Sequence, residues 1–441
     1  MKPRTLWLIA VITVIIAAVP PPAMARNGKE PSAPKYTVVL LETPDDCNGF
    51  AAAINNRGTI VGEWTRPCSG GDSRSAVWRR GAFNDLLPED EVFSSATDVN
   101  ERGQIIGEGR GGSLFQAFFW ERGVRTNFTL GGPEAVSQAL ALNERGQAVG
   151  LSTIGPDTPE GQPHHAFLFH NGIITDLGTL PGHRLSAASD INERGQIVGV
   201  SVEELPSGER TPHAVLWDDG NIVDLGTLGG QDSSAMAINN RGQIIGFSTN
   251  AAGQLRAFLW QNGVMVDIGT LGGNTSVPHA INKRGQIIGS SDTADGMRRG
   301  FVWEDGVMTD LGSFGGSSTS PLAINDHGQI IGQGSTEFGQ SRPFLWQKGR
   351  LFDISPMTPF TTAIVLGINE LGVIVGLVDF RPAVWIPLKR IHTRRDHDRG
   401  HDDHYDRGGD RTLHDRNKGE HHRGHHDDHQ TFPGSVPAPG Q

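Results

Sequence analysis

The stretch INNRGQIIGFS at residues 238–248 decides how this chain of 441 residues folds, because its pattern recurs along most of the sequence. An aliphatic residue precedes an asparagine, a glycine follows three residues later, and a second glycine follows four residues after that. A repeat of this length indicates that each unit is one supersecondary element. The pattern occurs eight times, and its asparagines are Asn55, Asn100, Asn143, Asn192, Asn239, Asn282, Asn325 and Asn369.

Each unit contains four short runs that are typical of β-strands. In the fifth unit these runs cover residues 233–239, 242–248, 256–260 and 264–271. β-Branched and aromatic residues lie inside the runs, and Gly, Asn and Pro lie between them. Four strands in each unit of about 40 to 50 residues are typical of a β-propeller blade. We therefore predict an all-β fold, an eight-bladed β-propeller with four-stranded blades.

The two ends of the repeat region complement each other. The eighth unit runs through residues 374–377 and 383–385 and then lacks a fourth strand, whereas YTVVLLE at residues 36–42 resembles a fourth strand that precedes the first unit. If this N-terminal strand completes the last blade, the ring closes and no sheet edge is left open. The alternative is a β-solenoid, which needs a cap at each end and does not explain the complementary split.

The N-terminus has the pattern of an export signal. Lys2 and Arg4 precede an apolar run over residues 6–19, and Ala23-Met24-Ala25 forms a small-x-small cleavage site. An uncleaved anchor is the alternative, but the run is too short to span about 30 Å of hydrocarbon. We expect residues 1–25 to be a signal peptide, residues 26–35 a linker and residues 36–388 the propeller. The protein is then exported, extracellular or periplasmic, with no membrane span after cleavage.

Residues 389–441 form a tail of a different composition. Between residues 389 and 430 it is rich in His, Asp, Glu, Lys and Arg and has almost no apolar residue, so we expect it to be disordered. Neutral imidazoles at high density bind zinc, copper or nickel. The sequence predicts no dedicated cofactor, and the candidate metal ligands are His421, His422, His425, His426 and His429.

Composition excludes several classes of protein. The formal net charge is −11, which argues against nucleic-acid binding because phosphate contacts need a basic surface. The chain has 59 Gly without a collagen period, and its 2 Cys cannot frame a disulfide-rich fold.

Both cysteines fall on the same side of the first unit, and an exported protein meets an oxidising compartment. We predict a Cys47–Cys68 disulfide, with two free thiols as the alternative.

Several recurring polar and aromatic residues are candidates for chemistry, and each has a structural alternative. One large aromatic residue per unit is a candidate sugar platform or packs between blades. The recurring Asp176, Asp224, Asp267 and Asp310 are candidate carboxylates or turn residues, and His164, His165, His183, His213 and His279 are candidate bases or metal ligands on the loop face that varies in length. HExxH, Walker and GxSxG motifs are absent from the sequence, so it identifies no catalytic residue.

The units resemble the HAF-repeat family of extracellular repeat proteins. The His-Ala-Phe element that gives the family its name stands at residues 165–167, and the DLGTLGG element stands at residues 224–230. Related forms are DLGTLPG at 176–182, DIGTLGG at 267–273 and DLGSFGG at 310–316. The resemblance covers residues 36–385 and implies bacterial export and repetitive β structure. It implies no reaction and no catalytic residue.

The sequence thus favours a non-enzymatic binding or scaffold module for an extracellular glycan or protein, and we expect a monomer. Two alternatives stay open. One is a propeller-based polysaccharide lyase or hydrolase, which requires titratable side chains that converge at one mouth of the channel. The near-equivalence of the eight units argues against such a cluster. The other is a metal-handling protein that works through its histidine-rich tail.

Overall fold

A computed structural model describes residues 34–66, 71–86, 93–111, 114–155, 162–204, 207–356 and 362–388. The predicted signal peptide, the tail with its candidate ligands His421, His422, His425, His426 and His429, and Cys68 lie outside these residues. Cys47 is buried, and its predicted disulfide with Cys68 stays a prediction. In the part of the chain that is described, no helix has the length and apolar character needed to cross a membrane.

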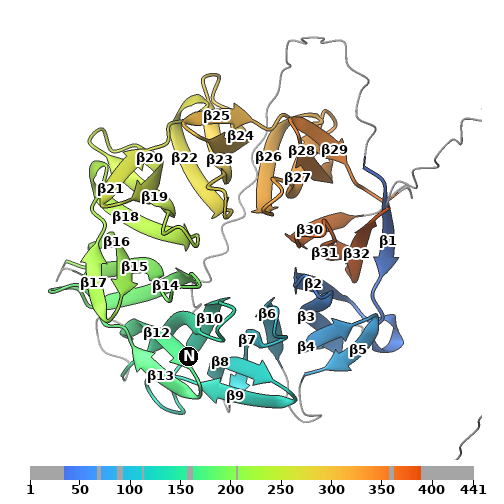
Figure 1. Ribbon diagram of the computed structural model, residues 1–441, viewed down its shortest axis with the longest axis horizontal. Helices are drawn as coiled ribbons and strands as arrows, with labels where there is room; N and C mark the ends of the chain where they lie inside the picture. Colours follow the sequence, from blue (N-terminus) through green and yellow to red (C-terminus); the bar gives the residue numbers. More distant parts are fainter. Residues whose placement is uncertain are drawn as a thin grey trace, which may run out of the picture. The chain divides into compact units, whose positions relative to one another are not determined.

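Within the described residues, 32 strands form eight antiparallel sheets of four strands, arranged as the blades of a ring (Figure 1). The first blade contains β2 (Gly49–Ile54), β3 (Thr59–Arg66), β4 (Asp72–Arg79) and β5 (Ala82–Asp85). The second contains β6 (Ser94–Val99), β7 (Ile105–Gly111), β8 (Leu114–Glu121) and β9 (Val124–Phe128), and the third contains β10 (Ser137–Leu142), β11 (Ala148–Thr153), β12 (His164–His170) and β13 (Ile173–Asp176). A 3₁₀ turn, η1 (Pro44–Asp46), precedes the first blade.

The remaining blades have the same order of strands. The fourth contains β14 (Leu185–Ile191), β15 (Ile197–Glu204), β16 (Arg210–Asp218) and β17 (Asn221–Asp224), and the fifth contains β18 (Gly229–Ile238), β19 (Ile244–Asn250), β20 (Leu255–Gln261) and β21 (Val264–Asp267). The sixth contains β22 (Gly272–Ile281), β23 (Ile287–Thr293), β24 (Arg298–Glu304) and β25 (Val307–Asp310), and the seventh contains β26 (Gly315–Ile324), β27 (Ile330–Thr336), β28 (Ser341–Gln347) and β29 (Arg350–Asp353). The first strand of each blade lies innermost, nearest the central axis of the ring (Figure 1).

The eighth blade joins the two ends of the repeat region. It contains β30 (Ala363–Ile368), β31 (Ile374–Val378), β32 (Arg381–Pro387) and, as its outer strand, β1 (Tyr36–Leu40). β1 pairs with β32 in antiparallel register, with Val38 opposite Trp385. The predicted eight-bladed propeller and its closure by the N-terminal strand are therefore confirmed.

The recurring asparagine shapes the turn between the first two strands of each blade. In the fifth blade, Oδ1 of Asn239 accepts hydrogen bonds from the N–H groups of Arg241 and Gln243 at 3.0 and 3.1 Å. Gly242 takes a φ of 76°, a conformation that glycine adopts without steric cost. The side chain therefore supplies bonds that the turn cannot make with its own carbonyls.

The same asparagines also join the blades to one another. Nδ2 of each donates to the backbone carbonyl of the corresponding asparagine in the next blade, at 2.8 to 3.2 Å. The last of these bonds, from Asn369 to the carbonyl of Asn55, closes the circle at 3.1 Å. All eight side chains are buried. One residue per repeat thus stabilises the turn and joins each blade to the next around the ring.

The core lies between the blades. Ile244 packs in a cluster with Leu216 of the fourth blade, and its neighbour Ile245 packs in a cluster with Ile287 of the sixth. Adjacent aliphatic residues on one strand therefore face opposite neighbours, as expected of a sheet covered on both sides. The recurring aromatic residues take part in the same packing, and Trp78 and Trp385 are fully buried. This supports their structural interpretation.

Candidate functional site

The aspartates of the DLGTL-like elements have a structural role. Asp176, Asp224, Asp267 and Asp310 each accept a hydrogen bond at 2.8 Å from the N–H of the glycine two residues later. Nδ1 of His165 and Nδ1 of His213 also lie 2.8 Å from the carboxylates of Asp176 and Asp224, within the same blades. These aspartates hold the turn after the outer strand, as expected of a repeated feature.

The candidate histidines do not form one site. No group of three or more metal-ligating side chains occurs among the described residues. The rings of His183 and His213 meet edge to face at 5.6 Å, and His164 and His165 begin β12. His279 was predicted on the variable loop face, which is wrong. It lies on the inner strand β22, within the run that corresponds to residues 233–239 of the fifth unit, and its Nδ1 is 2.7 Å from the carbonyl of Pro321 in the next blade.

Two of the eight blades carry a carboxylate on the innermost strand where the other six carry a small residue. The residue two positions before the recurring asparagine is alanine or glycine in six blades. In the second and fourth blades it is Asp98 on β6 and Asp190 on β14. Each is half-buried, and each directly follows a bulge in the pairing of the innermost strand. Neither residue was predicted as a site from the sequence, although the substitution in two of the eight repeats is visible there.

Each aspartate reaches from its own blade to the next. Asp190 accepts the N–H of Ile191 and, across the blade boundary, the N–H of Ile238, both at 2.8 Å. Asp98 likewise accepts the N–H of Val99 at 2.8 Å and a hydrogen bond from the N–H of Leu142 on β10. The Asp98 carboxyl group therefore lies at the boundary of the second and third blades, and the Asp190 carboxyl group lies at the boundary of the fourth and fifth blades. The inner strands β10 and β14 lie between them.

Burial raises the pKa of both carboxyl groups. It raises the pKa of Asp98 to about 6 and that of Asp190 to about 7, although the backbone N–H bonds lower both values. The negative charge of Asp98 adds to the shift of Asp190, so the two groups are close enough to interact. The charge of Glu144 in the third blade adds to the shift of Asp98. Asp98 thus ionises first, and its charge keeps the proton on Asp190 to higher pH.

The arrangement provides an acid and a base at the same pH. Between about pH 6 and 7 the populated form has Asp98 ionised and Asp190 protonated. Leu140 on β10, one of the two inner strands between them, has an apolar side chain that is 42% exposed. A carboxylic acid and a carboxylate at one wall can donate and accept protons in the same reaction.

The raised pKa values predict a pH-dependent cost to stability. Because folded Asp190 holds its proton up to about pH 7 and the unfolded group loses it near pH 4, the folded protein loses stability as pH rises between these values. Asp190→Ala introduces alanine, which most of the other blades carry at this position, and removes this pH-dependent loss of stability. Relative to the wild type, the variant should gain roughly 2 kcal/mol between pH 5 and pH 8. Urea unfolding at both pH values measures it.

A variant of an exposed carboxylate is the control for that experiment. Glu134 lies in an exposed turn of the third blade. Glu134→Gln changes net charge by the same amount and should shift stability by less than about 0.5 kcal/mol at either pH. An Asp190→Ala variant whose difference from the wild type does not change with pH would show that Asp190 does not titrate in this range.

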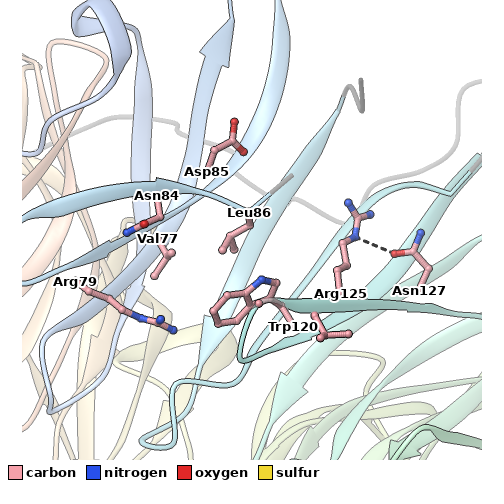
Figure 2. Close-up of a pocket in the computed structure, with 10 residues that line it drawn as sticks. Val77, Arg79, Asn84, Asp85, Leu86, Trp120, Arg125 and Asn127 are labelled. Carbon is pink, nitrogen blue, oxygen red and sulfur yellow. Dashed lines mark hydrogen bonds between the residues drawn. The ribbon is translucent and has the colours of Figure 1, made fainter. Parts of the chain in front are cut away.

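A separate cavity of about 800 Å³ lies between the first and second blades (Figure 2). Its wall includes Arg79 from the end of β4 and Arg125 from β9, with Trp120 from β8. In the view of Figure 2, Trp120 lies between the two arginines. The cavity lies between outer parts of the blades, so it is distinct from the channel that the inner strands surround.

Comparison with known protein families gives no match, and neither does comparison with curated protein sequences. Solved structures do match. A Mycobacterium tuberculosis puromycin-hydrolyzing peptidase matches with a TM-score of 0.47 and 13% identity, over 79% of this chain and 61% of that one. Porphyromonas gingivalis dipeptidyl peptidase 4 matches with a TM-score of 0.49 and 11% identity, over 75% of this chain and 56% of that one. Pyrococcus horikoshii acylaminoacyl peptidase gives 0.45 and 11%, over 75% and 57%.

The prediction of a non-enzymatic binding or scaffold module is not kept, since these three matched structures are those of peptidases. The near-equivalence of the units was the argument against an enzyme, and Asp98 and Asp190 are where that equivalence fails. The chain spans about three fifths of the length of each matched protein. At these identities the likeness shows the fold alone.

Proposed function

We propose that the protein is a hydrolase whose acid–base pair is Asp98 and Asp190. We propose further that its substrate is a polysaccharide that binds along the central axis of the ring, against the innermost strands. The observation that carries the proposal is that the two carboxyl groups lie on inner strands of the ring, Asp98 toward β10 and Asp190 toward β18, and interact electrostatically, with pKa values of about 6 and about 7. Six blades have no carboxylate at this position, so the propeller scaffold does not require one.

The chemistry assigns one role to each residue. Protonated Asp190 donates its proton to the oxygen of the glycosidic bond as that bond breaks. Ionised Asp98 accepts a proton from the water molecule whose oxygen attacks the sugar carbon. The pair ends with its protonation states exchanged and returns to the starting state through solvent. Enzymes that hydrolyse glycosidic bonds usually use a pair of carboxyl groups whose pKa values differ.

Hydrolysis suits the pair better than the lyase reaction. A lyase must remove a proton from carbon, which needs a stronger base than a carboxylate with a pKa of about 6. Hydrolysis needs only proton transfer to and from oxygen. The N-terminal segment with the pattern of an export signal, and the resemblance to HAF repeats, support action outside the cytoplasm, where polysaccharides occur as polymers.

The test is a search for hydrolysis by the purified full-length protein. Neutral and acidic polysaccharides are offered at pH 6.5 and new reducing ends are measured, while peptides serve as the second substrate class, since the matched structures include peptidases. We expect a polysaccharide to be cleaved. Asp190→Ala and Asp98→Ala should each lower kcat by at least about 100-fold, the usual contribution of a general acid or base.

Asp310→Ala is the matched control, because it removes a carboxylate of the same length that binds a turn N–H in the sixth blade. It should leave kcat within about twofold of the wild type while each channel variant loses activity. Cleavage that survives in both channel variants would contradict the proposal, as would a protein that cleaves peptides and no polysaccharide.

A further inference from the structure

A histidine and a serine of the sixth blade depart from the repeat together. His279 stands three residues before the recurring asparagine, where the other seven blades carry Ala, Thr, Ser, Leu or Met. Ser290 directly follows the second glycine of the repeat motif, where the other blades carry Glu, Leu, Val, Phe or Gln. In the fold, Oγ of Ser290 lies 3.5 Å from Nε2 of His279, so the two departures meet at one place.

The backbone explains how the two side chains meet. Ser290 lies on β23, where it pairs with Val277 of the inner strand β22. The pairing of these strands shifts between Pro278 and Ala280, so His279 is the additional residue of a β-bulge. A bulge changes the direction of a side chain, and bulges are frequent next to active sites. At this bulge the imidazole of His279 lies beside the hydroxyl of Ser290.

A hydrogen bond to the next blade sets the tautomer of His279. Its Nδ1 lies 2.7 Å from the carbonyl oxygen of Pro321 in the seventh blade. Because a carbonyl oxygen only accepts, Nδ1 carries the proton of the neutral ring and Nε2 presents its lone pair to Ser290. Burial lowers the pKa of His279 and the positive charge of Arg298 lowers it further, although the bond to Pro321 raises it. The imidazole is therefore neutral at neutral pH and can accept a proton.

The bonding of Ser290 differs from that of the neighbouring serine. Oγ of Ser291 donates to the carbonyls of Thr275 and Asp292, at 3.2 and 3.1 Å. Among the described residues, the Ser290 hydroxyl has Nε2 of His279 as its hydrogen-bond partner and no backbone carbonyl. A bond of 3.5 Å is long, as bonds between a nucleophile and its base often are before substrate binds. Ser290 is 5% exposed, so only a small group can reach Oγ.

We propose that Ser290 is the nucleophile of an esterase site for short acyl groups such as acetyl, with His279 as its base and the carbonyl of Pro321 orienting that base. Oγ attacks the carbonyl carbon of the ester while its proton passes to Nε2. The bond from this carbon to the alcohol oxygen breaks, and the alcohol leaves with the proton from Nε2. Water then attacks the acyl-serine and gives a proton to Nε2, and this proton returns to Oγ as the carboxylic acid leaves.

A nucleophile, its base and a group that orients the base are the arrangement that this covalent chemistry needs. All three belong to the boundary between the sixth and seventh blades. Asp98 and Asp190 take no part in the reaction, so the inference does not depend on polysaccharide hydrolysis.

The experiment detects the modified serine directly. The purified full-length protein is treated with a small alkyl fluorophosphonate, in which Oγ displaces fluoride from phosphorus, and in parallel with 4-nitrophenyl acetate. We expect one phosphonyl adduct per chain, which peptide mass spectrometry locates on Ser290, and release of nitrophenolate. Ser290→Ala should abolish the adduct. His279→Gln keeps a donor for the carbonyl of Pro321 but lacks the base, so it should slow both reactions at least about 100-fold.

Ser234→Ala is the matched control. Ser234 is a half-buried serine on the inner strand of the fifth blade, and that blade has Met236 in place of the histidine. This variant should react like the wild type. His279→Met, which introduces the residue of the fifth blade, is the second variant without a base, and urea unfolding shows that each variant is folded. The inference is overturned if Ser290 carries no adduct, or if both His279 variants react at the wild-type rate.

Discussion

Asn239→Ala is expected to destabilise the propeller by about 4 kcal/mol, because each buried polar group left without a partner costs about 1 to 3 kcal/mol. The substitution removes the acceptor for the N–H groups of Arg241 and Gln243 and the donor to the carbonyl of Asn282 in the next blade. The Asn239 side chain is buried, so replacing these bonds by bonds to water requires rearrangement. Urea unfolding followed by tryptophan fluorescence measures the loss.

Two further variants separate the turn from the ring. Asn239→Asp keeps the oxygen that accepts the two turn N–H groups but loses the donor to the carbonyl of Asn282 and to Oε1 of Gln243, so the part of the loss that it retains is due to these Nδ2 bonds and not to the turn acceptor. Asn240→Ala is the control, because Asn240 is exposed and accepts one bond from the N–H of Glu193. A loss for Asn239→Ala no larger than that for Asn240→Ala would contradict the structural role of the ring.

Deletion of residues 36–41 is expected to destabilise the protein by about 5 kcal/mol, since each apolar side chain buried by β1 contributes about 1.5 to 3 kcal/mol and its strand bonds add to this. Tyr36 and Val38 pack on the core of the eighth blade, and Leu41 is buried. The deletion also exposes the edge of β32 to pairing with other chains. We expect a lower unfolding midpoint and concentration-dependent association.

A synthetic peptide of residues 34–43, added in excess, should restore the midpoint of the deletion variant, because β1 pairs only with β32 in this blade. Val39→Ser is the control on the same strand, since the side chain of Val39 is 41% exposed. It should change stability by less than about 1 kcal/mol. A deletion variant that unfolds at the wild-type midpoint as a monomer would show that the ring does not need this closure.

The sequence predicted the fold well because the fold is a consequence of the repeat. Eight copies of one turn motif set the number of blades, and the missing strand after residue 385 matched the extra strand at residues 36–42. The second role of the asparagine could not be predicted. Its donor bond joins residues 43 to 49 positions apart, and at the closure it joins Asn369 to Asn55. That contact depends on the angle between neighbouring blades, and a local sequence pattern does not specify this angle.

The candidate sites were missed for the opposite reason. The sequence pointed to carboxylates that recur in the repeat as candidate site residues. The structure shows that they are turn residues: Asp176, Asp224, Asp267 and Asp310. The chemistry proposed here lies where the repeat fails. Asp98 and Asp190 replace small residues. Both departures are visible in the aligned units, but only the folded ring brings the two carboxyl groups close enough to interact.

The pH dependence of kcat/KM on the polysaccharide that the protein cleaves tests the acid–base pair most directly. With Asp98 as the base and Asp190 as the acid, the profile should be bell-shaped, with limbs at about pH 6 and about pH 7, and Asp190→Ala should lose the alkaline limb together with most of the activity. A wild-type profile that is flat between pH 5 and pH 8, or one that Asp190→Ala leaves unchanged, would contradict the assignment of these two carboxyl groups.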